Sequence, residues 1–146
     1  MSNYRLTDEQ RQLKEAARRF AEEKLRPIAL ETERQSAPMP RETLKLLAEH
    51  GYVGLDIPTE YGGLGLNIME CAIVLEELSS VWFSASTNAM TLLTGPLLAF
   101  GTEEQKQKYL PAIVSGDILT AFALTEPDAG SDASSIQSFA RKDGDD

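Results

Sequence analysis

The chain has 146 residues, of which 42% are hydrophobic and 25% charged, and it carries a formal net charge of −9. This length and composition suit a globular domain with a hydrophobic core, and the acidic balance disfavours nucleic acid and anionic membranes as main partners. The single cysteine excludes an internal disulfide and agrees with a reducing compartment. Because the N-terminus has neither an apolar signal region nor the acid-poor character of a transit peptide, we expect a cytoplasmic location. No grouping of His, Cys, Asp and Glu has metal-ligand spacing, so no metal site is predicted.

Helices are predicted over most of the first 116 residues. Thr7–Gln10 has the pattern of a capping box, and the apolar period after it predicts a helix that continues past Pro27 toward Glu33, with a kink at the proline. Pro40 suits the first turn of the next helix, and Gly51 is the natural residue to end it.

Glycines in the segment Tyr61–Gly65 indicate a turn or a close approach of two backbone segments. Apolar spacing then predicts a third helix over Asn67–Ser80 and a nearly apolar fourth over Trp82–Phe100, in one piece or in two around Gly95-Pro96. A helix that is apolar on all sides is typically central. A second capping box, Thr102–Gln105, begins a fifth helix.

The sequence period changes after the fifth helix. Residues 118–125 are rich in apolar and β-favouring types and predict a strand, and residues 135–140 predict a second. We therefore expect a helical domain over residues 1–116 and the beginning of a β-domain over residues 117–146. The segment Lys142–Asp146 resembles the tip of a β-hairpin without its return strand, so the chain is interpreted as a fragment or as one half of a split protein.

The segment Phe122–Asp132 carries the strongest chemical signal. It begins with strand-forming residues, turns at Glu126-Pro127 and ends in a loop of small, hydroxyl-bearing and acidic residues. The Thr125 hydroxyl and nearby amides can pair with the polar edge of a planar ring, while Gly130 and Ser131 can hold a phosphate oxygen. A plain turn capped by an aspartate is the alternative interpretation.

Phe122–Asp132 is also very similar to the signature of the acyl-CoA dehydrogenase family. The segments Pro58–Leu66, Glu76–Leu78 and Gly101–Pro111 agree with the family in order and spacing, so the resemblance spans essentially the whole chain. It implies a mainly α fold, the N-terminal helical bundle of an acyl-CoA dehydrogenase-like fold followed by the first strands of its middle β-domain.

The resemblance assigns binding roles to individual residues. It places Phe122, Leu124 and Thr125 along the isoalloxazine ring of FAD. Ser131, beside Gly130, falls where the family contacts the FAD pyrophosphate and the pantetheine arm of the CoA thioester.

The family's acyl-chain pocket is lined by the helix that matches residues 82–100. The candidates on roughly one face of that helix are Ser84, Thr87, Asn88, Thr91 and Leu92. Such side chains also satisfy backbone carbonyls or allow close packing in a buried helix, and both interpretations stay open.

The implied activity is FAD-dependent α,β-dehydrogenation of an acyl-CoA to a trans-2-enoyl-CoA in fatty acid metabolism, with electrons passed to an electron-transferring flavoprotein. The family's base is a carboxylate in a C-terminal domain, so it is expected beyond Asp146. Glu126 and Asp132 are interpreted as holding the loop, no catalytic residue is predicted in this chain, and the chain alone is expected to be inactive. The family is commonly tetrameric, so a homo-oligomer is expected at full length.

Two alternatives to this function remain open. An acyl-CoA oxidase or a flavin monooxygenase would keep the same fold and change the chemistry. A non-catalytic helical interaction module, or one half of a split enzyme, would need no chemistry within the chain.

Overall fold

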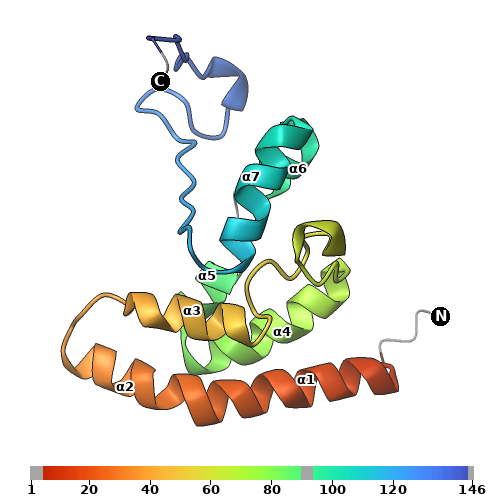
Figure 1. Ribbon diagram of the computed structural model, residues 1–146. Coiled ribbons are helices and arrows are strands. Elements are labelled where there is room, and N and C mark those ends of the chain that lie inside the picture. The colour runs from red at the N-terminus through yellow and green to blue at the C-terminus, as the bar shows by residue number, and fades with distance from the viewer. Residues whose placement is uncertain (1–4, 90–93, 145–146) are drawn as a thin grey trace.

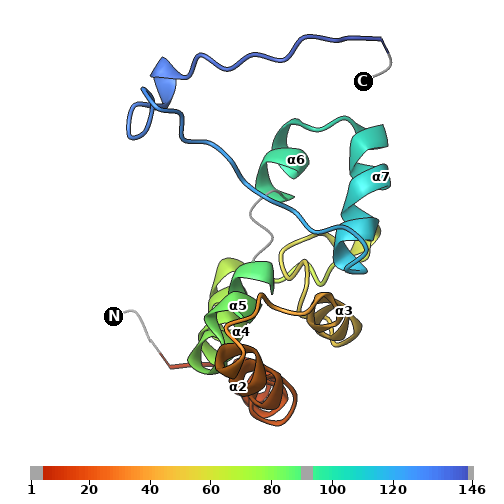
Figure 2. The same cartoon turned by 90° about the vertical axis from the view of Figure 1, so that its left-hand side faces the viewer.

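The computed structural model describes residues 5–89 and 94–144. These residues are mostly helical, which confirms a mainly α fold, and Figures 1 and 2 show a C-terminal segment leading away from the helical body. The helices are α1 (Asp8–Phe20), α2 (Arg26–Arg34), α3 (Arg41–Glu49), α4 (Ile68–Val81), α5 (Phe83–Ala89), α6 (Thr94–Phe100) and α7 (Glu103–Val114). Short helical turns cover Ala21–Leu25, Thr59–Tyr61 and Ala133–Ser135.

The first two helices form one nearly continuous rod. Thr7 and Gln10 cap α1 reciprocally, with the Gln10 amide donating to Thr7 Oγ1 at 3.2 Å and the Thr7 amide donating to Gln10 Oε1 at 3.0 Å. A π-helical turn over Ala21–Leu25 joins α1 to α2, and Pro27 lies in the first turn of α2. The predicted continuation past Pro27 is confirmed, and the irregularity expected there is this wider turn, since proline cannot donate into a regular helix.

The hydrophobic core lies between α1, α3, α4 and α7 and the loop that follows α3. Its largest fully buried side chains are Leu25, Leu47, Leu55, Ile57, Leu78, Leu110 and Ile113. One charged group is buried with them: Glu77 of α4 accepts from Arg18 at 2.8 and 3.1 Å and pairs with Lys14 at 3.2 Å. The α1–α4 contact is therefore apolar with a paired carboxylate at its edge.

The glycine segment after α3 confirms the predicted close approach. A Cβ atom on Gly63 would lie 2.1 Å from the Ile57 carbonyl oxygen, a distance that no side chain can occupy. The Gly65 amide donates to the same oxygen at 2.8 Å. Two backbone segments thus pack directly on each other and carry the chain from α3 to α4.

The predicted helix over residues 82–100 needs correction. Trp82 is extended rather than helical, α5 begins after it, and Gly95-Pro96 lies within α6 instead of at a break. Proline fits near the start of a helix because the first-turn amides have no helical partner. α5 buries Ala85, Ser86 and Ala89, whereas Phe83 at its start is 72% and Phe100 at the end of α6 is 89% exposed, so the stretch is central in part.

The predicted strands are not formed in the C-terminal segment. No strand occurs among the described residues, and in this segment the pairing of Glu126 with Ala129 is an isolated bridge. Residues 118–125 and 136–140 are coil and Ser135 ends the short helical turn Ala133–Ser135, because a strand exists only when a neighbouring strand accepts its hydrogen bonds. The domain boundary after residue 116 remains a proposal.

The predicted hairpin tip lies at the edge of the described part of the chain. The hairpin tip predicted over Lys142–Asp146 is described only as far as residue 144, where a turn is present, and Asp146 itself lies outside the described residues. Within residues 5–89 and 94–144, no helix has the length and apolar character needed to cross a membrane.

Candidate functional site

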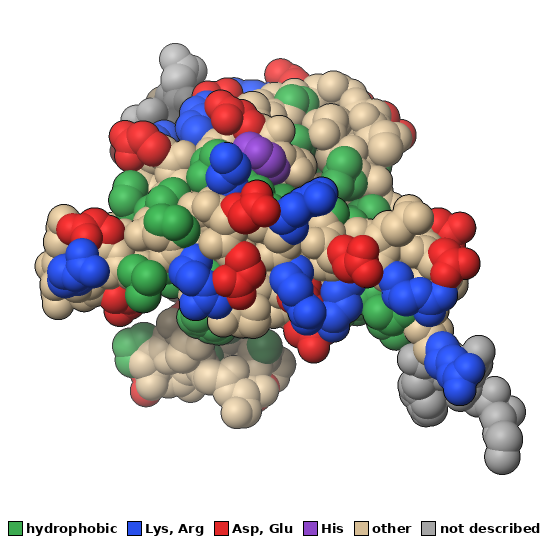
Figure 3. Space-filling view, turned by 90° about the horizontal axis from the view of Figure 1, so that it is seen from below, with side chains coloured by type: hydrophobic (Ala, Val, Ile, Leu, Met, Phe, Trp, Pro, Cys, Tyr) green, Lys and Arg blue, Asp and Glu red, His purple; other side chains and the backbone are tan. Residues whose placement is uncertain are grey.

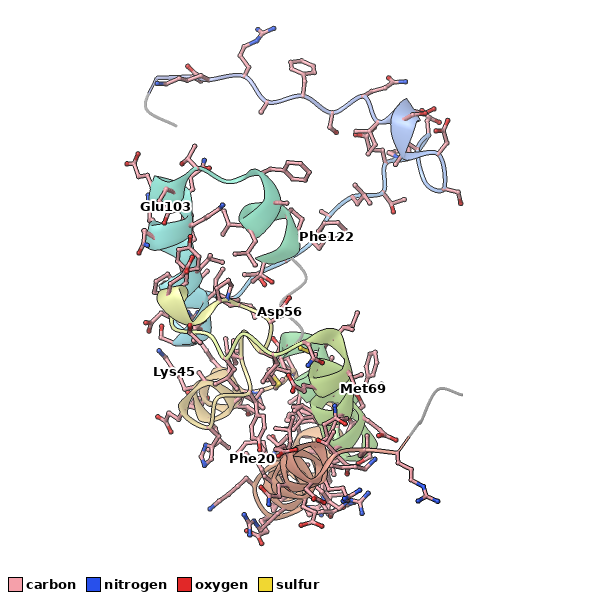
Figure 4. The ribbon with its side chains drawn as sticks, turned by 90° about the vertical axis from the view of Figure 1, so that its right-hand side faces the viewer. Phe20, Lys45, Asp56, Met69, Glu103 and Phe122 are labelled. Atoms are coloured by element: carbon pink, nitrogen blue, oxygen red, sulfur yellow. The ribbon has the colours of Figure 1, made fainter. Side chains whose placement is uncertain are left out.

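The site begins where the chain leaves α7. Gly116 ends the helix with φ +69°, and the amides of Asp117 and Ile118 donate to the Ala112 carbonyl at 3.0 and 3.1 Å. The chain then runs extended past α6 and α7, and Figure 4 shows Phe122 on this extended segment. A left-handed glycine at this position lets the helix stop and the chain change direction within one residue.

Residues 118–122 close one side of a cavity of about 260 Å³. The other walls come from three helices and the loop after α3, and the lining residues there are Leu44, Val53, Thr87, Asn88 and Ile113. On its other side the same segment borders a hollow of about 530 Å³ between α6 and α7. A single extended segment therefore separates two concave surfaces.

The structure brings together some of the residues predicted to contact the flavin and some of those predicted to line the acyl-chain pocket. Phe122, a predicted flavin contact, lines the same cavity as Thr87 and Asn88 on the predicted acyl-chain helix. Leu124 and Thr125 follow Phe122 along the chain and are exposed. They do not line the cavity.

The predicted phosphate-binding residues lie further along the C-terminal segment. Gly130 and Ser131 are exposed, and a Cβ on Gly130 would meet no atom within 4 Å. The surface beside this glycine is therefore open, as the approach of a ligand to the backbone requires. Neither residue lines the cavity that contains Phe122.

The carboxylates of the loop hold its backbone. Glu126 accepts the amides of Gln137 and Ser138 at 2.8 Å each, and these hydrogen bonds, that from Gln137 foremost, hold the pKa of its carboxyl below the usual value. This geometry confirms the interpretation of Glu126 as a loop-holding residue. The Glu126 carboxylate accepts two hydrogen bonds and is ionised near neutral pH, which makes it a poor proton acceptor.

Asp132 holds the other end of the same loop. Its carboxylate accepts the Ser134 amide at 3.1 Å and the Ser135 hydroxyl at 2.5 Å, and it accepts from the Ser134 hydroxyl as well. The hydroxyl of Ser134 is the main cause of its lowered pKa. The aspartate cap of the plain-turn interpretation is thus present, and it leaves Ser131 beside it exposed.

The catalytic base is not located by the structure. The resemblance to the family implies a base beyond Asp146, and the described residues end at 144, so that prediction lies outside them. The two carboxylates of the loop do not replace it, because both Glu126 and Asp132 are engaged by donors of their own segment.

The polar side chains of α5 bond to their own helix. The Thr87 hydroxyl donates to the Ser84 carbonyl at 2.9 Å, and Asn88 Nδ2 donates to the same oxygen at 2.8 Å. Thr87 and Asn88 reach the cavity, whereas Ser84 lines a separate hollow beside α2 with Leu30 and other residues. The backbone-satisfying interpretation is therefore observed, and two of the side chains also reach a concave surface. Thr91 and Leu92 lie outside the described residues.

The sequence did not indicate several cavity residues. Leu44, Val53 and Ile113 are buried core residues whose helical or apolar pattern predicts burial but not a position at a cavity. Lys45 and Asp117, near the start of the extended segment, form an ion pair across α3 and the end of α7. Because Lys45 and Asp117 lie 72 residues apart, no local sequence pattern predicts that they pair. Among the described residues, no group of three or more His, Cys, Asp or Glu could hold a metal ion.

Comparisons with known proteins agree on one family. Residues 7–117 match the family model described as acyl-CoA dehydrogenase, N-terminal domain. The chain is 41% identical over 140 residues to acryloyl-CoA reductase (NADH) of Anaerotignum propionicum, which covers 94% of this chain and 35% of that protein. It is 39% identical over 142 residues to 3-(aryl)acrylate reductase of Clostridium sporogenes, which covers 95% of this chain and 37% of that protein.

Solved structures give the same result. Butyryl-CoA dehydrogenase of Megasphaera elsdenii matches 99% of this chain and 39% of its own, with a TM-score of 0.82 and 33% identity. The match to glutaryl-CoA dehydrogenase of Mycobacterium smegmatis in complex with FADH2 covers 95% of this chain and 36% of that protein, with a TM-score of 0.84 and 30% identity. The match to a structure from work on the electron transferring flavoprotein of Acidaminococcus fermentans covers 99% of this chain and 38% of that one, with a TM-score of 0.84 and 38% identity. The chain therefore spans little more than a third of the length of the proteins it matches.

Proposed function

Because the chain belongs to the acyl-CoA dehydrogenase family, we propose that it supplies the N-terminal part of a flavoenzyme that acts on the Cα–Cβ bond of an acyl-CoA thioester. The observation that carries the proposal is the cavity in which Phe122 of the C-terminal segment meets Thr87 and Asn88 of α5. A ring-stacking aromatic and polar helix residues around one hollow are the parts that a site for a planar cofactor and a thioester tail needs.

The exposed groups of the C-terminal segment fit FAD. Thr125 and Ser131 present exposed hydroxyls, Gly130 leaves its backbone approachable, and Phe122 is 51% exposed. In this proposal Phe122, Leu124 and Thr125 contact the flavin ring, and Gly130 and Ser131 bind its phosphates. The likeness to a glutaryl-CoA dehydrogenase in complex with FADH2 supports the choice of cofactor.

The substrate contacts follow from the same arrangement. Asn88 binds the acyl part of the substrate within the cavity, and Ser131 also contacts the pantetheine arm. Ser84 and Leu92 remain proposed acyl-pocket residues, although Ser84 lines a different hollow of the described chain and Leu92 lies outside the described residues. The backbone carbonyl of Ser84 also accepts from Thr87 and Asn88 and so helps to fix their side chains.

This chain binds and orients, and it does not remove the substrate proton. When bound, FAD supplies a hydride acceptor for the β-hydrogen while a base takes the α-proton, which gives a trans-2-enoyl-CoA. Glu126 and Asp132 are engaged by backbone and hydroxyl donors of their own loop, so neither is assigned as that base. The chain alone is therefore inactive in this proposal, and the base belongs to a part of the protein beyond Asp146.

The proposed electron acceptor follows from the need to reoxidise the reduced flavin. A reduced flavin must pass two electrons on, and an electron-transferring flavoprotein is the proposed acceptor, in line with the structural likeness to a protein from work on such a flavoprotein. We also propose a role in fatty acid metabolism in the cytoplasm and a homo-oligomer, a tetramer, for the complete protein.

A second candidate function runs the same chemistry in reverse. The relatives with 41% and 39% identity are named as reductases of an acryloyl-CoA and of an aryl acrylate. The same flavin site serves either direction, because the bond and the cofactor are the same. The direction then depends on the electron donor or acceptor with which the complete protein works.

The experiment is turnover by the complete, FAD-loaded protein. Saturated acyl-CoAs of graded length are offered with an artificial electron acceptor, and the matching enoyl-CoAs with a reduced donor. We expect turnover in at least one direction, and the faster direction identifies the function. An FAD-loaded protein that fails with every acyl and enoyl thioester contradicts the proposal, and failure to bind FAD favours a non-catalytic helical module. Rapid reaction of the reduced flavin with oxygen would instead identify an oxidase or a monooxygenase.

A residue-level test uses Thr125→Val, which keeps the shape and removes the hydroxyl. We expect an altered flavin spectrum and slower flavin reduction with an unchanged fold. Thr59→Val, at an exposed threonine of the turn before α4, is the matched control and should change neither. Unchanged flavin affinity, spectrum and rate in Thr125→Val would leave this residue as a turn residue only.

A further inference from the structure

Two cationic side chains of α3 bind the residues with which the chain leaves α7. Lys45 forms an ion pair with Asp117 and donates to the Ser115 carbonyl at 3.2 Å, while Arg41 donates to the Asp117 carbonyl at 2.9 Å. The Ser115 hydroxyl donates to the remaining Asp117 oxygen at 2.6 Å. We call these four residues the α3–α7 clamp.

The backbone beneath the clamp is closely packed. A Cβ on Gly116 would lie 3.2 Å from both the Leu44 carbonyl oxygen and the Ala48 Cβ, so the end of α7 touches α3 with no room to spare. The other end of α7 is also fixed, because the Tyr61 hydroxyl donates to the Glu103 carboxylate at 3.1 Å. Figure 4 shows Glu103 and Lys45 at different levels along this side of the molecule. The helix is therefore held at two points, and the chain leaves it at the second.

The clamp also adjoins the candidate site. Leu44, next to Lys45 in α3, lines the cavity, and Ile118, next to Asp117, is the first residue of the extended segment that closes it. A change in the angle at which the chain leaves Asp117 moves every residue from Ile118 to Phe122. Over five extended residues a small change of angle becomes a displacement of ångströms at Phe122.

We infer that the α3–α7 clamp is a positioning site, which sets the direction of residues 118–122 and with it the distance between Phe122 and the cavity wall formed by Thr87 and Asn88. Lys45 is its central positioning residue, because its ammonium group bonds to both Ser115 and Asp117. The side chains of the pair are 44% and 62% exposed, so their effect on global stability is small and their effect on local geometry can be measured separately.

The first test is amide hydrogen exchange in the 146-residue chain. The amides of Asp117 and Ile118 both donate to Ala112 at the end of α7, so their exchange reports whether the chain beside the clamp stays in place. We expect Lys45→Met to raise their exchange rates about tenfold while amides in α1 and α4 stay unchanged. Lys45→Arg keeps the charge and should restore protection, and Lys24→Met, at an exposed lysine of the π-helical turn, should have no effect. Unchanged exchange at both amides in Lys45→Met overturns the inference.

The second test concerns the consequence for catalysis, which rests on the proposed function. In the complete, FAD-loaded protein, a misplaced Phe122 is expected to lower kcat/KM for an acyl-CoA about tenfold in Lys45→Met, with recovery in Lys45→Arg. Asp117→Asn should give the same loss, which guards against an individual variant that fails to fold. A wild-type protein that is inactive with every thioester contradicts the proposed function, whereas an active wild type with equal kcat/KM in both variants overturns the positioning role.

Discussion

The helical body and the C-terminal segment differ in how far they bury their side chains. In the body, Leu78 is fully buried and even the carboxylate of Glu77 is covered and paired with two cations. In the segment after Gly116, Phe122 is 51% and Phe139 80% exposed. A mixed pattern of Lys, Arg, Asp and Glu covers the face of the body seen in Figure 3, as expected for a surface in water. The body contains the hydrophobic core, although Phe83 and Phe100 on its helices are exposed, and the segment buries Ala129 but leaves its phenylalanines at the surface.

This difference teaches where function can lie in such a chain. The residues proposed to bind FAD are in the exposed segment, and those that give the fold its stability are in the body. The two meet at the cavity and at the α3–α7 clamp, defined above by Arg41, Lys45, Ser115 and Asp117. Stability and binding should therefore respond to different substitutions.

The largest effect is expected from a core truncation in the body. Leu78→Ala removes a fully buried side chain and should lower the free energy of unfolding by about 2–5 kcal/mol. Leu124→Ala, at a leucine that is 48% exposed in the segment, is the matched control and should change it by less than about 0.5 kcal/mol. Urea unfolding followed by the fluorescence of the buried Trp82 measures both. Equal losses would show that the segment contributes to the core.

A glycine pair sharpens the same contrast. Gly63→Ala places a methyl group against the Ile57 carbonyl and should destabilise the body by about 1–3 kcal/mol. Gly130→Ala meets open space, so the unfolding free energy should stay unchanged. The same urea titration applies, and a tolerated Gly63→Ala would mean that the two backbone segments separate easily.

The buried carboxylate gives a smaller, pH-dependent effect. The Arg18 guanidinium first, and Lys14 second, hold the pKa of Glu77 below its usual value of 4.5. A lowered folded-state pKa stabilises the folded protein above that usual value, and the stabilisation is lost as the pH falls through the folded-state pKa. Glu77→Gln should therefore cost about 1 kcal/mol at pH 7, a modest figure because the Arg18 side chain is 62% exposed.

The difference between Glu77→Gln and the parent chain should shrink as the pH is lowered below 4.5. Glu76→Gln, at the neighbouring exposed glutamate that pairs with Lys14, is the control and should cost less. A Glu77→Gln deficit that is the same at pH 7 and in acid would contradict the ion-pair explanation.

The smallest global effect is expected in the loop of the C-terminal segment. Glu126→Ala removes the acceptor of the Gln137 and Ser138 amides and should raise their hydrogen-exchange rates. The free energy of unfolding should change by less than about 0.5 kcal/mol, because the loop is exposed. If exchange at these two amides does not change, the carboxylate does not hold the loop in solution.

Local sequence signals predicted the helical part well. Capping boxes at Thr7 and Thr102 fix the starts of α1 and α7, because the cap and its partner lie three residues apart. Pro27 marked the irregular turn between α1 and α2, and Gly51, with φ +76°, ends the region of α3 as predicted. Each of these features depends on contacts within one helical turn.

Non-local features were predicted less well. The strands expected over residues 118–125 and 135–140 are absent from the described residues, because a strand depends on partners remote in sequence and a β-favouring composition does not supply them. The fourth helix, predicted over Trp82–Phe100 in one piece or in two around Gly95-Pro96, begins only after the extended Trp82, and Gly95 and Pro96 lie within α6. The binding role of Phe122–Asp132 stays a prediction that rests on the family motif, as does the base expected beyond Asp146.

The sequence by itself determined most of the helices, the capping boxes, the turn glycines and the family, since these depend on neighbouring residues and on a continuous motif. Tertiary structure alone decided which predicted site residues share a space. It placed Phe122 with Thr87 and Asn88, left Thr125 and Ser131 on the exposed segment, and joined Lys45 to Asp117 across 72 residues. The physical reason is that a cavity or an ion pair between distant segments exists only after the core has fixed the helices that carry them.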